Sequence, residues 1–368
     1  MAERLAKIKG ENVLLIEQRN HIGGNCYDCY DDHGILIHKF GPHIFHTDNE
    51  QVWNYLSEFT DWHHYQHKVL SQIDGHEVTI PFNLNTLYAL LPESIASRIE
   101  AKLIENFGFG SKLSIKELQD CEDQDLQFLA IFVHDKVFLN YTVKQWGVEP
   151  DKISPKVAAR LSIIVSKDDR YFHDRYQGLP KFGYTRMFAN MLNLSSIKLL
   201  LNTTMKDLVE IDHDKLEIRF MGNCFCGKLI YTGMLDDLFN NCYGKLPYRA
   251  LKFEFEKVKR KYFQKSAVIN YPNNYDFTRI TEFKHMTGQD SQFSTILREY
   301  PTLYNNTGTN KNTPSYPIAT QENNSKVKKY MSLVKRSDQI VILGRLAEYK
   351  YYDMDKLVEK VLSVIKNL

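Results

Sequence analysis

The chain has 368 residues, of which 43% are hydrophobic and 25% are charged, so it is long enough for two or three domains with a substantial core. Its formal net charge of +2 gives no electrostatic reason to expect a nucleic-acid partner. The N-terminus lacks the apolar segment of a signal peptide, and the longest apolar run, at 128–133, is too short to cross a membrane. We therefore expect a cytoplasmic globular protein without integral membrane contact.

Six cysteines lie at positions 26, 29, 121, 224, 226 and 242. Cys26-x-x-Cys29 together with Cys224-x-Cys226 could suggest a zinc site. The second spacing does not match a zinc ribbon, however, and the first falls in a turn between expected strands. Free thiols and no metal site are the favoured interpretation.

The N-terminal stretch predicts part of a dinucleotide-binding sheet. Residues 2–9 have the spacing of an amphipathic helix, and an apolar strand from position 13 ends at one carboxylate, Glu17. Such an acid accepts hydrogen bonds from a ribose, and the glycines that follow, Gly23 and Gly24, let backbone approach a cofactor. The preceding strand, with its glycine-rich turn, should lie about 20 residues upstream. Because only twelve residues precede position 13, we expect the first strand to be missing and the chain to be N-terminally truncated.

A helical segment follows a region of short strands. Thr47 or Asp48 is a candidate N-cap for a helix at 49–59, and 63–82 has the pattern of strands. From 83 to about 164 apolar residues recur at helical spacing, which predicts an inserted helical domain. The helices expected there are 84–91, 95–107, 114–120, 126–138 and 155–165, the last begun by Ser154 with Pro155 at its first position.

The second half of the chain predicts a return to the first sheet and a separate antiparallel one. Residues 248–300 alternate polar and apolar side chains, which indicates antiparallel strands. The other expected elements are a helix at 187–194, strands at 198–201, 217–220 and 229–231, a helix at 325–335, a strand at 340–343 and a helix at 356–366.

Three stretches carry candidate chemistry. In 41–46 two histidines stand three residues apart beside a proline, which favours a turn over a metal pair. In 141–147 a tyrosine and a tryptophan follow a helix, so they suggest either a stacking platform for a base or core filling. In 344–354 an arginine and an aspartate bracket three tyrosines before a helix, whose N-terminus can attract an anion or an electron-rich ring.

Seven motifs, in order along nearly the whole chain, resemble those of bacterial UDP-galactopyranose mutases. They are RNHIGGN at 19–25, GPHIFHTDNE at 41–50, YTVKQWG at 141–147, RYQGLPKFGYT at 175–185, YTG at 231–233, AVINYPNNYDFTRI at 267–280 and GRLAEYKYYDM at 344–354.

The resemblance implies an FAD enzyme that interconverts UDP-galactopyranose and UDP-galactofuranose for cell-surface polysaccharide, including lipopolysaccharide. In this family the flavin must be reduced, and its N5 displaces UDP and forms an adduct with the sugar while the ring opens and recloses. The implied partner is UDP-galactose, and a homodimer is expected.

Site residues carried over by motif fall into three groups. The implied catalytic residues are Arg160, Arg279 and His46. The implied substrate-binding residues are His67, Phe138, Tyr141, Thr142, Trp146, Tyr171, Asn270, Tyr316 and Tyr351. The implied cofactor-binding residues are Glu17, Gln18, Gly24, Asn25, His43, Ile44, Thr204, Arg345, Asp353 and Met354. His67 stands where the family has an asparagine, which leaves that contact open.

The expected fold class is α/β: an FAD-binding Rossmann-like parallel sheet, its first strand missing, with an inserted helical domain and an antiparallel sheet domain. We expect the FAD-binding domain at 1–62, 182–240 and 326–368, the helical substrate and dimerisation domain at 83–165, and the antiparallel sheet domain at 63–82, 166–181 and 241–325.

Two alternatives remain open. One is a truncated, catalytically impaired member that lacks the FAD fingerprint. The other is a flavin oxidoreductase of the amine-oxidase-like group, which would have no use for both an Arg160/Arg279 pair and a uridine platform at 141–146.

Overall fold

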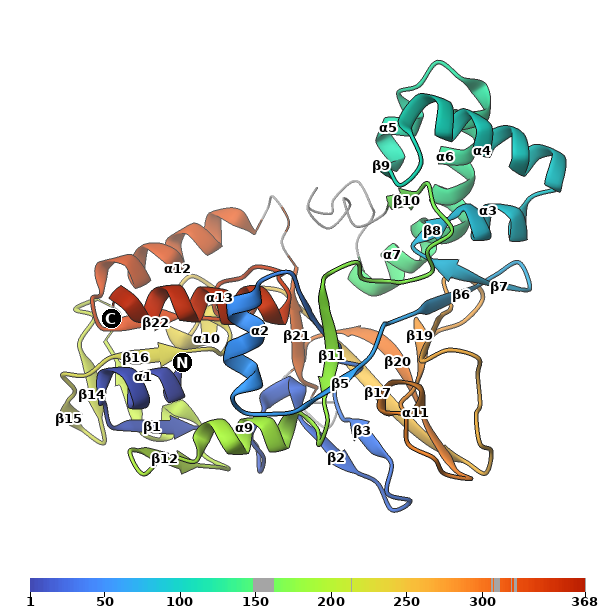
Figure 1. The fold of residues 1–368 in the computed structure, drawn as a ribbon. Helices are drawn as coiled ribbons and strands as arrows, with labels where there is room; N and C mark the ends of the chain where they lie inside the picture. The colour runs from blue at the N-terminus through green and yellow to red at the C-terminus, as the bar shows by residue number, and fades with distance from the viewer. Residues whose placement is uncertain are drawn as a thin grey trace.

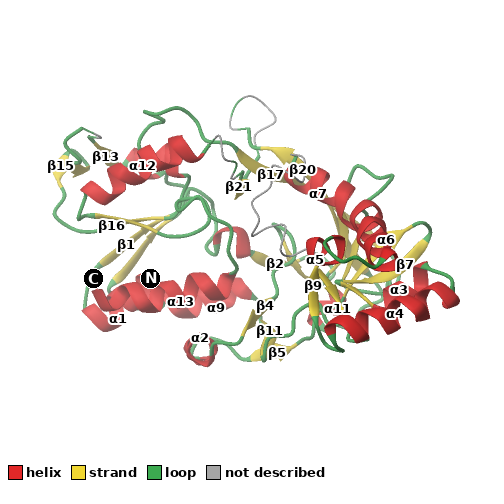
Figure 2. Cartoon of the chain, turned by 90° about the horizontal axis from the view of Figure 1, so that it is seen from above, coloured by secondary structure: helices red, strands yellow, loops and turns green. Residues whose placement is uncertain are grey.

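The fold is described from a computed structural model, which covers residues 1–147, 162–212, 214–305, 307, 312–318, 320 and 323–367. Paired parallel strands and their helices form one end of the molecule, and a helical cluster forms the other (Figures 1 and 2). A seven-stranded sheet lies between them. Among the described residues, no helix is both long and apolar enough to span a membrane.

The first end contains two parallel strand pairs. Strand β1 pairs with β12, with Val13 opposite Ile197, and β16 pairs with β22, with Leu229 opposite Ile340. Buried Leu235, Phe239 and Tyr330 contribute to the core beneath the second pair. The elements here are α1 (Ala2–Lys9), β1 (Val13–Ile16), α9 (Tyr184–Leu192), β12 (Ile197–Leu200), β16 (Leu229–Tyr231), α10 (Leu235–Leu238), α12 (Asn324–Arg336), β22 (Ile340–Ile342) and α13 (Met354–Val364).

Smaller elements complete this end. They are the hairpin strands β2 (Asp28–Tyr30) and β3 (Leu36–His38), the three-stranded sheet of β13 (Val209–Ile211), β14 (Ile218–Phe220) and β15 (Asn223–Cys224), and the 3-10 turns η1 (Gly24–Cys26), η4 (Met205–Asp207) and η5 (Ile365–Asn367).

Helix α2 (Glu50–Ser57) begins one residue after its expected start at position 49. Its N-cap is Asn49, whose side chain accepts hydrogen bonds from the backbone N–H groups of Gln51 and Val52. The expected caps were wrong because both side chains accept other hydrogen bonds. Thr47 accepts from the N–H of Asn49 in the turn before the helix, and Asp48 accepts from the N–H of Arg175 in a distant segment. The helix packs Trp53 onto strands β4 (Phe45–Thr47), β11 (Tyr176–Pro180) and β5 (Trp62–His64).

The central sheet has the order β21-β17-β20-β19-β18-β6-β7, and all its neighbours are antiparallel except β18 and β6. Strands β17 and β20 are its longest antiparallel pair, as the alternation at 248–300 predicts. The strands are β6 (Val69–Ile73), β7 (His76–Ile80), β17 (Tyr248–Val258), β18 (Val268–Asn270), β19 (Arg279–Glu282), β20 (Ser294–Leu303) and β21 (Pro314–Pro317), with helix α11 (Lys284–Thr287) after β19.

The helical cluster shares one hydrophobic core with this sheet. It contains α3 (Leu84–Leu90), α4 (Glu93–Phe107), α5 (Ile115–Gln119), α6 (Gln124–Val133), the π-helical turn η2 (His134–Leu139) and α7 (Asn140–Trp146), with a small sheet of β8 (Phe82–Asn83), β10 (Ser162–Ile164) and β9 (Lys112–Ser114). The prediction of a helix at 155–165 was wrong for its last residues, because Ser162–Ile164 form a strand. Ile163 and Ile164 are buried in strand β10, which bonds to a strand on each side, and β-branched side chains suit that position. Residues 154–161 lie outside the described residues.

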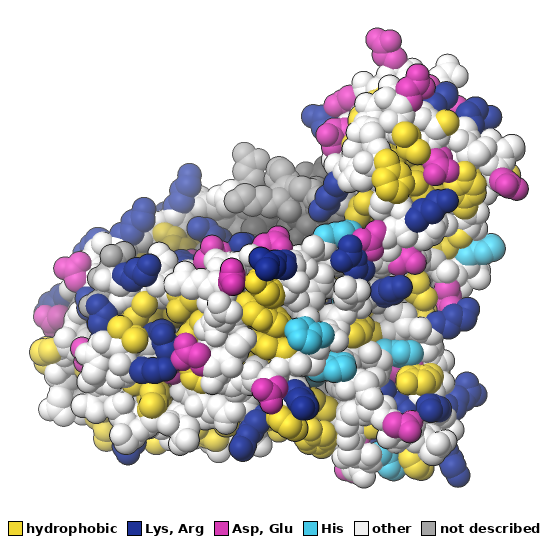
Figure 3. Space-filling view, in the orientation of Figure 1, with side chains coloured by type: hydrophobic (Ala, Val, Ile, Leu, Met, Phe, Trp, Pro, Cys, Tyr) yellow, Lys and Arg dark blue, Asp and Glu magenta, His cyan; other side chains and the backbone are white. Residues whose placement is uncertain are grey.

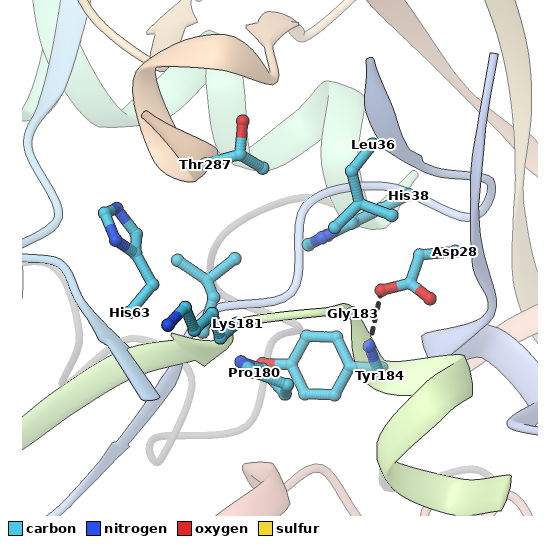
Figure 4. Close-up of a pocket in the computed structure, with 10 residues that line it drawn as sticks. Asp28, Leu36, His38, His63, Pro180, Lys181, Gly183, Tyr184 and Thr287 are labelled. Atoms are coloured by element: carbon cyan, nitrogen blue, oxygen red, sulfur yellow. Dashed lines mark hydrogen bonds between the residues drawn. The ribbon is translucent and has the colours of Figure 1, made fainter. Parts of the chain in front are cut away.

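Helix α9 begins at Tyr184, three residues before its expected start, because Asp28 caps it from another strand. The Asp28 carboxylate accepts hydrogen bonds from the N–H groups of Tyr184 (2.6 Å) and Thr185 (2.8 Å) (Figure 4). The cavity in Figure 4 has a volume of only about 20 Å³, and its lining includes Asp28, Tyr184, His38, His63 and Thr287. It can hold about one water molecule, so it is a structural feature rather than a ligand site.

We expect Asp28→Ala to destabilise the protein by about 2–3 kcal/mol, because one buried and one partly buried amide lose a charged acceptor. Urea denaturation followed by circular dichroism measures the loss as a lower midpoint at unchanged slope. Asp32→Ala is the control, since Asp32 is exposed and forms a surface ion pair with Lys257. Equal midpoints for the two variants would contradict the capping role.

Candidate functional site

A row of polar side chains crosses the central sheet. Ser71 stands opposite Asn270, Asn270 opposite Arg279, and Arg279 opposite Glu299, on four adjacent strands. Residues directly opposite one another point to the same face of a sheet, so the register alone gathers these groups. The sheet therefore brings together two residues that were predicted from the sequence, Asn270 and Arg279.

Arg279 and Glu299 form a buried ion pair in this row. The guanidinium Nε lies 2.7 Å from Glu299 Oε1, and the glutamate side chain is fully buried. Burial lowers the pKa of Arg279, but the attraction of Glu299 outweighs it, so the pKa lies above its ordinary value. Glu299 was not predicted as a site residue. The sequence shows only that it lies in an alternating strand, and a single acid on the inner face of a strand forms no recognisable motif.

Asn270 offers a free polar atom at the same place. Its Oδ1 is buried and has no hydrogen-bond partner among the described residues. Buried polar atoms are almost always paired, so an unpaired one beside an arginine fits a ligand that supplies the missing donor.

Tyrosines surround the row. Burial raises the pKa of Tyr141, which also lies within electrostatic reach of Arg279, Tyr171 and Glu299. The ring of Tyr316 lies 5.7 Å from that of Tyr351, and burial raises the pKa of Tyr316 as well. The phenols of Tyr141 and Tyr316 are thus neutral hydroxyls near neutral pH, able to donate hydrogen bonds to a phosphate.

Arg345 joins the tyrosines to the start of helix α13. Its guanidinium lies 4.5 Å from the ring centre of Tyr351 and 5.6 Å from that of Tyr316. It donates to the carbonyl of Tyr352 and lies 3.7 Å from Asp353, the residue before Met354. The site therefore has a second cation, held over aromatic faces.

Two histidines of the site are held neutral. His43 donates from Nδ1 to the carbonyl of Gly41 (2.8 Å), which leaves Nε2 as an acceptor, and its backbone N–H donates to Nδ1 of His38 (3.0 Å). Burial and the neighbouring His38 lower the pKa of His43 to about 3. Burial, Arg279 and His46 lower the pKa of His67 to about 3, and its Nδ1 lies 3.1 Å from the hydroxyl of Tyr65.

His46 has a carboxylate partner. Its Nδ1 lies 3.0 Å from Asp174 Oδ2, and its ring stacks on Phe172 with centroids 3.7 Å apart. Strand pairing of β4 with β11 places the two segments side by side. A carboxylate on Nδ1 fixes the tautomer that leaves Nε2 as the acceptor when the ring is neutral. The sequence predicted His46 but not Asp174.

The expected ribose contacts lie at the end of β1. Glu17 Oε1 accepts from the N–H of Arg19, whose guanidinium donates to Asn25 Oδ1 (2.8 Å). Gly24 has φ +56° and begins the turn η1, in a conformation that suits glycine. Cys26 Sγ lies 3.6 Å from Met354 Sδ, so this turn meets the start of α13.

The remaining predicted residues differ in burial, and some lie outside the described residues. Thr142 and Phe138 are buried, and Phe138 belongs to the core of the helical cluster. Ile44 packs against the same core, whereas Gln18 and Thr204 are exposed at the first end of the molecule. Arg160 and the side chain of Trp146 lie outside the described residues.

A second cavity, of about 540 Å³, opens beside the site and is lined by segments 64–66 and 170, 173–177. It includes Asp174 but none of the tyrosines around Arg279, so cavity shape alone does not locate the candidate site. Among the described residues no three His, Cys, Asp or Glu side chains are arranged to hold a metal ion, and the six cysteines are unbridged.

The fold and this geometry can be compared with known proteins. The family model described as UDP-galactopyranose mutase matches residues 136–351, and the model of an NAD(P)-binding Rossmann-like domain matches residues 1–59. A crystal structure of reduced UDP-galactopyranose mutase aligns with a TM-score of 0.74 at 16% identity and covers 100% of this chain and 90% of that one. The class is thus a Rossmann-like, FAD-dependent enzyme fold.

Relatives of known name narrow the class. UDP-galactopyranose mutase of Mycoplasma pneumoniae is 35% identical over 364 residues, 98% of this chain and 90% of that protein. dTDP-fucopyranose mutase of Escherichia coli is 31% identical over 367 residues, 98% of this chain and 93% of that protein. The chain belongs to the UDP-galactopyranose mutase family, whose members are isomerases. The α/β fold, the family and its cofactor FAD, as predicted from the sequence, are confirmed.

The residues of this chain fit FAD at two of its parts. Glu17 and Asn25 carry side-chain oxygens at the end of β1, the kind of acceptor that ribose hydroxyls use, and His43 lies within electrostatic reach of Arg345, which in turn lies near Asp353 at the start of α13. A G-x-G-x-x-G turn, the usual contact of the diphosphate, is not found among the described residues.

The buried histidines predict acid sensitivity. A folded-state pKa of about 4 for His38 and about 3 for His67, against about 6.5 in an unfolded chain, means that the unfolded state binds more protons. Stability should therefore fall as the pH drops below about 6.5, by about 1.4 kcal/mol per pH unit for each histidine. His67→Asn should flatten this dependence by about one proton, measured by urea denaturation from pH 7.5 to 5. His64→Asn, an exposed histidine on β5, is the control, and equal slopes for both variants would contradict the assignment.

Proposed function

We propose that this chain interconverts UDP-galactopyranose and UDP-galactofuranose with reduced FAD, and so supplies a galactofuranose donor for cell-surface polysaccharide such as lipopolysaccharide in the cytoplasm. The observation that carries the proposal is the buried row of Asn270, Arg279 and Glu299 beside neutral tyrosines. A guanidinium in a partly buried, tyrosine-lined site is suited to the negative charge that develops on a leaving diphosphate.

Bound and reduced, FAD would supply a nucleophile at N5 for the anomeric carbon of the sugar. The chain's own residues bind and orient the substrate. Arg279 holds the diphosphate, and the hydroxyls of Tyr171, Tyr316 and Tyr351 donate to its oxygens. Asn270 and His67 face the sugar, and Tyr141 and Thr142 hold the uridine. Trp146 and Arg160 stay predicted contacts of the uridine and the diphosphate.

The cofactor site is proposed at the other side of the row. Glu17, Gln18, Gly24 and Asn25 hold the ribose end with Thr204, and His43, Ile44, Arg345, Asp353 and Met354 hold the ring end. His46, held by Asp174, presents Nε2 near the ring and keeps its orientation.

The proposal is tested by incubating the purified chain with FAD, dithionite and UDP-galactopyranose and separating the products by chromatography. We expect UDP-galactofuranose with reduced FAD and none with oxidised FAD. A parallel reaction contains dTDP-fucopyranose. Conversion of that compound alone would overturn the proposed substrate, and no conversion of either would overturn the activity.

Arg279→Ala should lower kcat by about 10²–10³, because the developing charge loses its preorganised donor. Arg298→Ala is the matched control, since Arg298 lies on the adjacent strand β20 and pairs with Glu256 on the surface. Initial rates at saturating substrate measure both variants. A near-normal kcat for Arg279→Ala would reject its role.

We propose further that the helical cluster joins two copies of the chain. Phe128 and Ile131 on α6 are 46% and 56% exposed, and the same helical segment also exposes Ile104 on α4 and Phe109 after it. Figure 3 shows hydrophobic side chains gathered over this cluster. Exposed apolar side chains of this size mark an interaction surface, and a second copy is the occupant that the family suggests.

Ile131→Glu should convert the dimer into a monomer, because a charge on a paired apolar surface must be desolvated. Sedimentation velocity measures the mass. Met221→Glu is the control, since Met221 is 66% exposed on the β14–β15 hairpin. A wild-type chain that sediments as a monomer would overturn the dimer.

A further inference from the structure

The motif at 141–147 contains two residues, Lys144 and Gly147, to which the proposed substrate contacts assign no role. Helix α7, which carries Tyr141 and Thr142, also carries Lys144, and it ends at Gly147. The ammonium group of Lys144 contacts the loop 271–277, which leads to Arg279. Its Nζ donates to the carbonyl oxygens of Tyr271 (2.7 Å) and Tyr275 (2.6 Å) and lies 3.4 Å from that of Phe277.

Three carbonyl oxygens match the three donors of an ammonium group. The three donors of lysine radiate from one compact ammonium, whereas those of arginine are spread over a planar fork, so lysine is suited to carbonyls that converge on one point. The loop itself is closed next to the ion pair, because the N–H of Tyr271 donates to the carbonyl of Thr278 and the N–H of Thr278 donates to the carbonyl of Glu299. Lys144 therefore ties the helix directly to the backbone that holds Arg279.

Arg249 on β17 holds the other side of the helix. Its Nη2 donates to the carbonyl of Lys144 (2.8 Å) and its Nε to that of Gln145 (3.1 Å), at the end of α7 where carbonyls lack helical partners. Arg249 is only 6% exposed. Gly147 has φ +66°, and a Cβ there would lie 2.6 Å from Arg249 Nη1, so the motif needs glycine for conformation and for space.

A further link runs along the exposed side. Asn140 Nδ2 donates to Asn273 Oδ1 (2.7 Å), and Asn273 Nδ2 donates to the carbonyl of Lys136 (3.2 Å). The start and the end of α7 are thus both bonded to elements of the central sheet domain.

We propose that Lys144 and Arg249 are positioning residues for the nucleotide: they clamp helix α7 between the loop 271–277 and strand β17 and so fix the distance from the uridine contacts to Arg279. This inference rests on the proposed function, in which α7 holds the uridine. It explains why both cations donate to backbone carbonyls and leave the phosphate to Arg279.

The test measures binding of UDP to the purified chain by calorimetry and inhibition by inorganic pyrophosphate. Lys144→Met and Arg249→Met should each weaken UDP binding about tenfold and raise KM with less effect on kcat, the pattern of lost uniform binding. Inhibition by pyrophosphate should stay within about twofold, since it needs Arg279 and not the uridine contacts. Lys252→Met, an exposed lysine on the same strand that pairs with Glu254, is the control.

The outcomes separate the two proposals. A wild-type chain that does not bind UDP overturns the proposed function. A wild-type chain that binds UDP, with both variants binding it equally well, overturns the clamp. Equal loss of UDP and pyrophosphate binding also overturns it, because that pattern means general unfolding of the site. Should either variant fail to fold, Asn273→Ala removes the milder link, and wild-type UDP affinity in that variant is evidence against the clamp.

Discussion

The ion pair of Arg279 and Glu299 is the constraint on which the rest of the site depends. Removing a carboxylate and a guanidinium from water costs several kcal/mol for each ion, and the pair is stable only if both charges stay in contact. Strand register provides this contact, since the two residues stand opposite each other on β19 and β20. The same carboxylate limits the turn at 41–44: a Cβ at Gly41 would lie 3.3 Å from Glu299 Oε1. One buried acid thus constrains both Arg279 and the turn that leads to His43.

Neutral histidines and tyrosines lie around the ion pair, so the arginines carry the positive charge that a ligand would meet. Burial keeps His43 and His67 unprotonated, with pKa values of about 3, and burial raises the pKa of Tyr141 and Tyr316. Glu299 already balances Arg279, so Arg345 is the next cation near the tyrosines. Such an environment binds an anion by hydrogen bonds from oriented neutral donors and one guanidinium rather than by a large positive field, which favours orientation over strong nonspecific attraction.

The sequence predicted most elements, because their apolar periodicity is strong, whereas the roles carried over by motif stay predictions. It failed where tertiary contacts decide the local structure. Ser162–Ile164 form a strand because two other strands bond to it, and helix α9 starts early because Asp28 reaches it from β2. Glu299, Asp174 and Arg249 were missed for the same reason. Each acts on a residue far away in the chain, so neither spacing nor composition marks it.

One continuous helical segment of the cluster connects its exposed apolar side chains with Tyr141. Helix α6, the π-helical turn η2 and helix α7 follow each other without a break from Gln124 to Trp146. The exposed Phe128 and Ile131 lie near the start of this rod and Tyr141 near its end. A π-helical turn adds a residue per turn and rotates the faces on either side of it, so one end can face outward while the other faces the site. Because Lys144 and Arg249 hold the far end to the central sheet, movement of the exposed end must be taken up by the turn or passed to Tyr141 and Thr142 on α7.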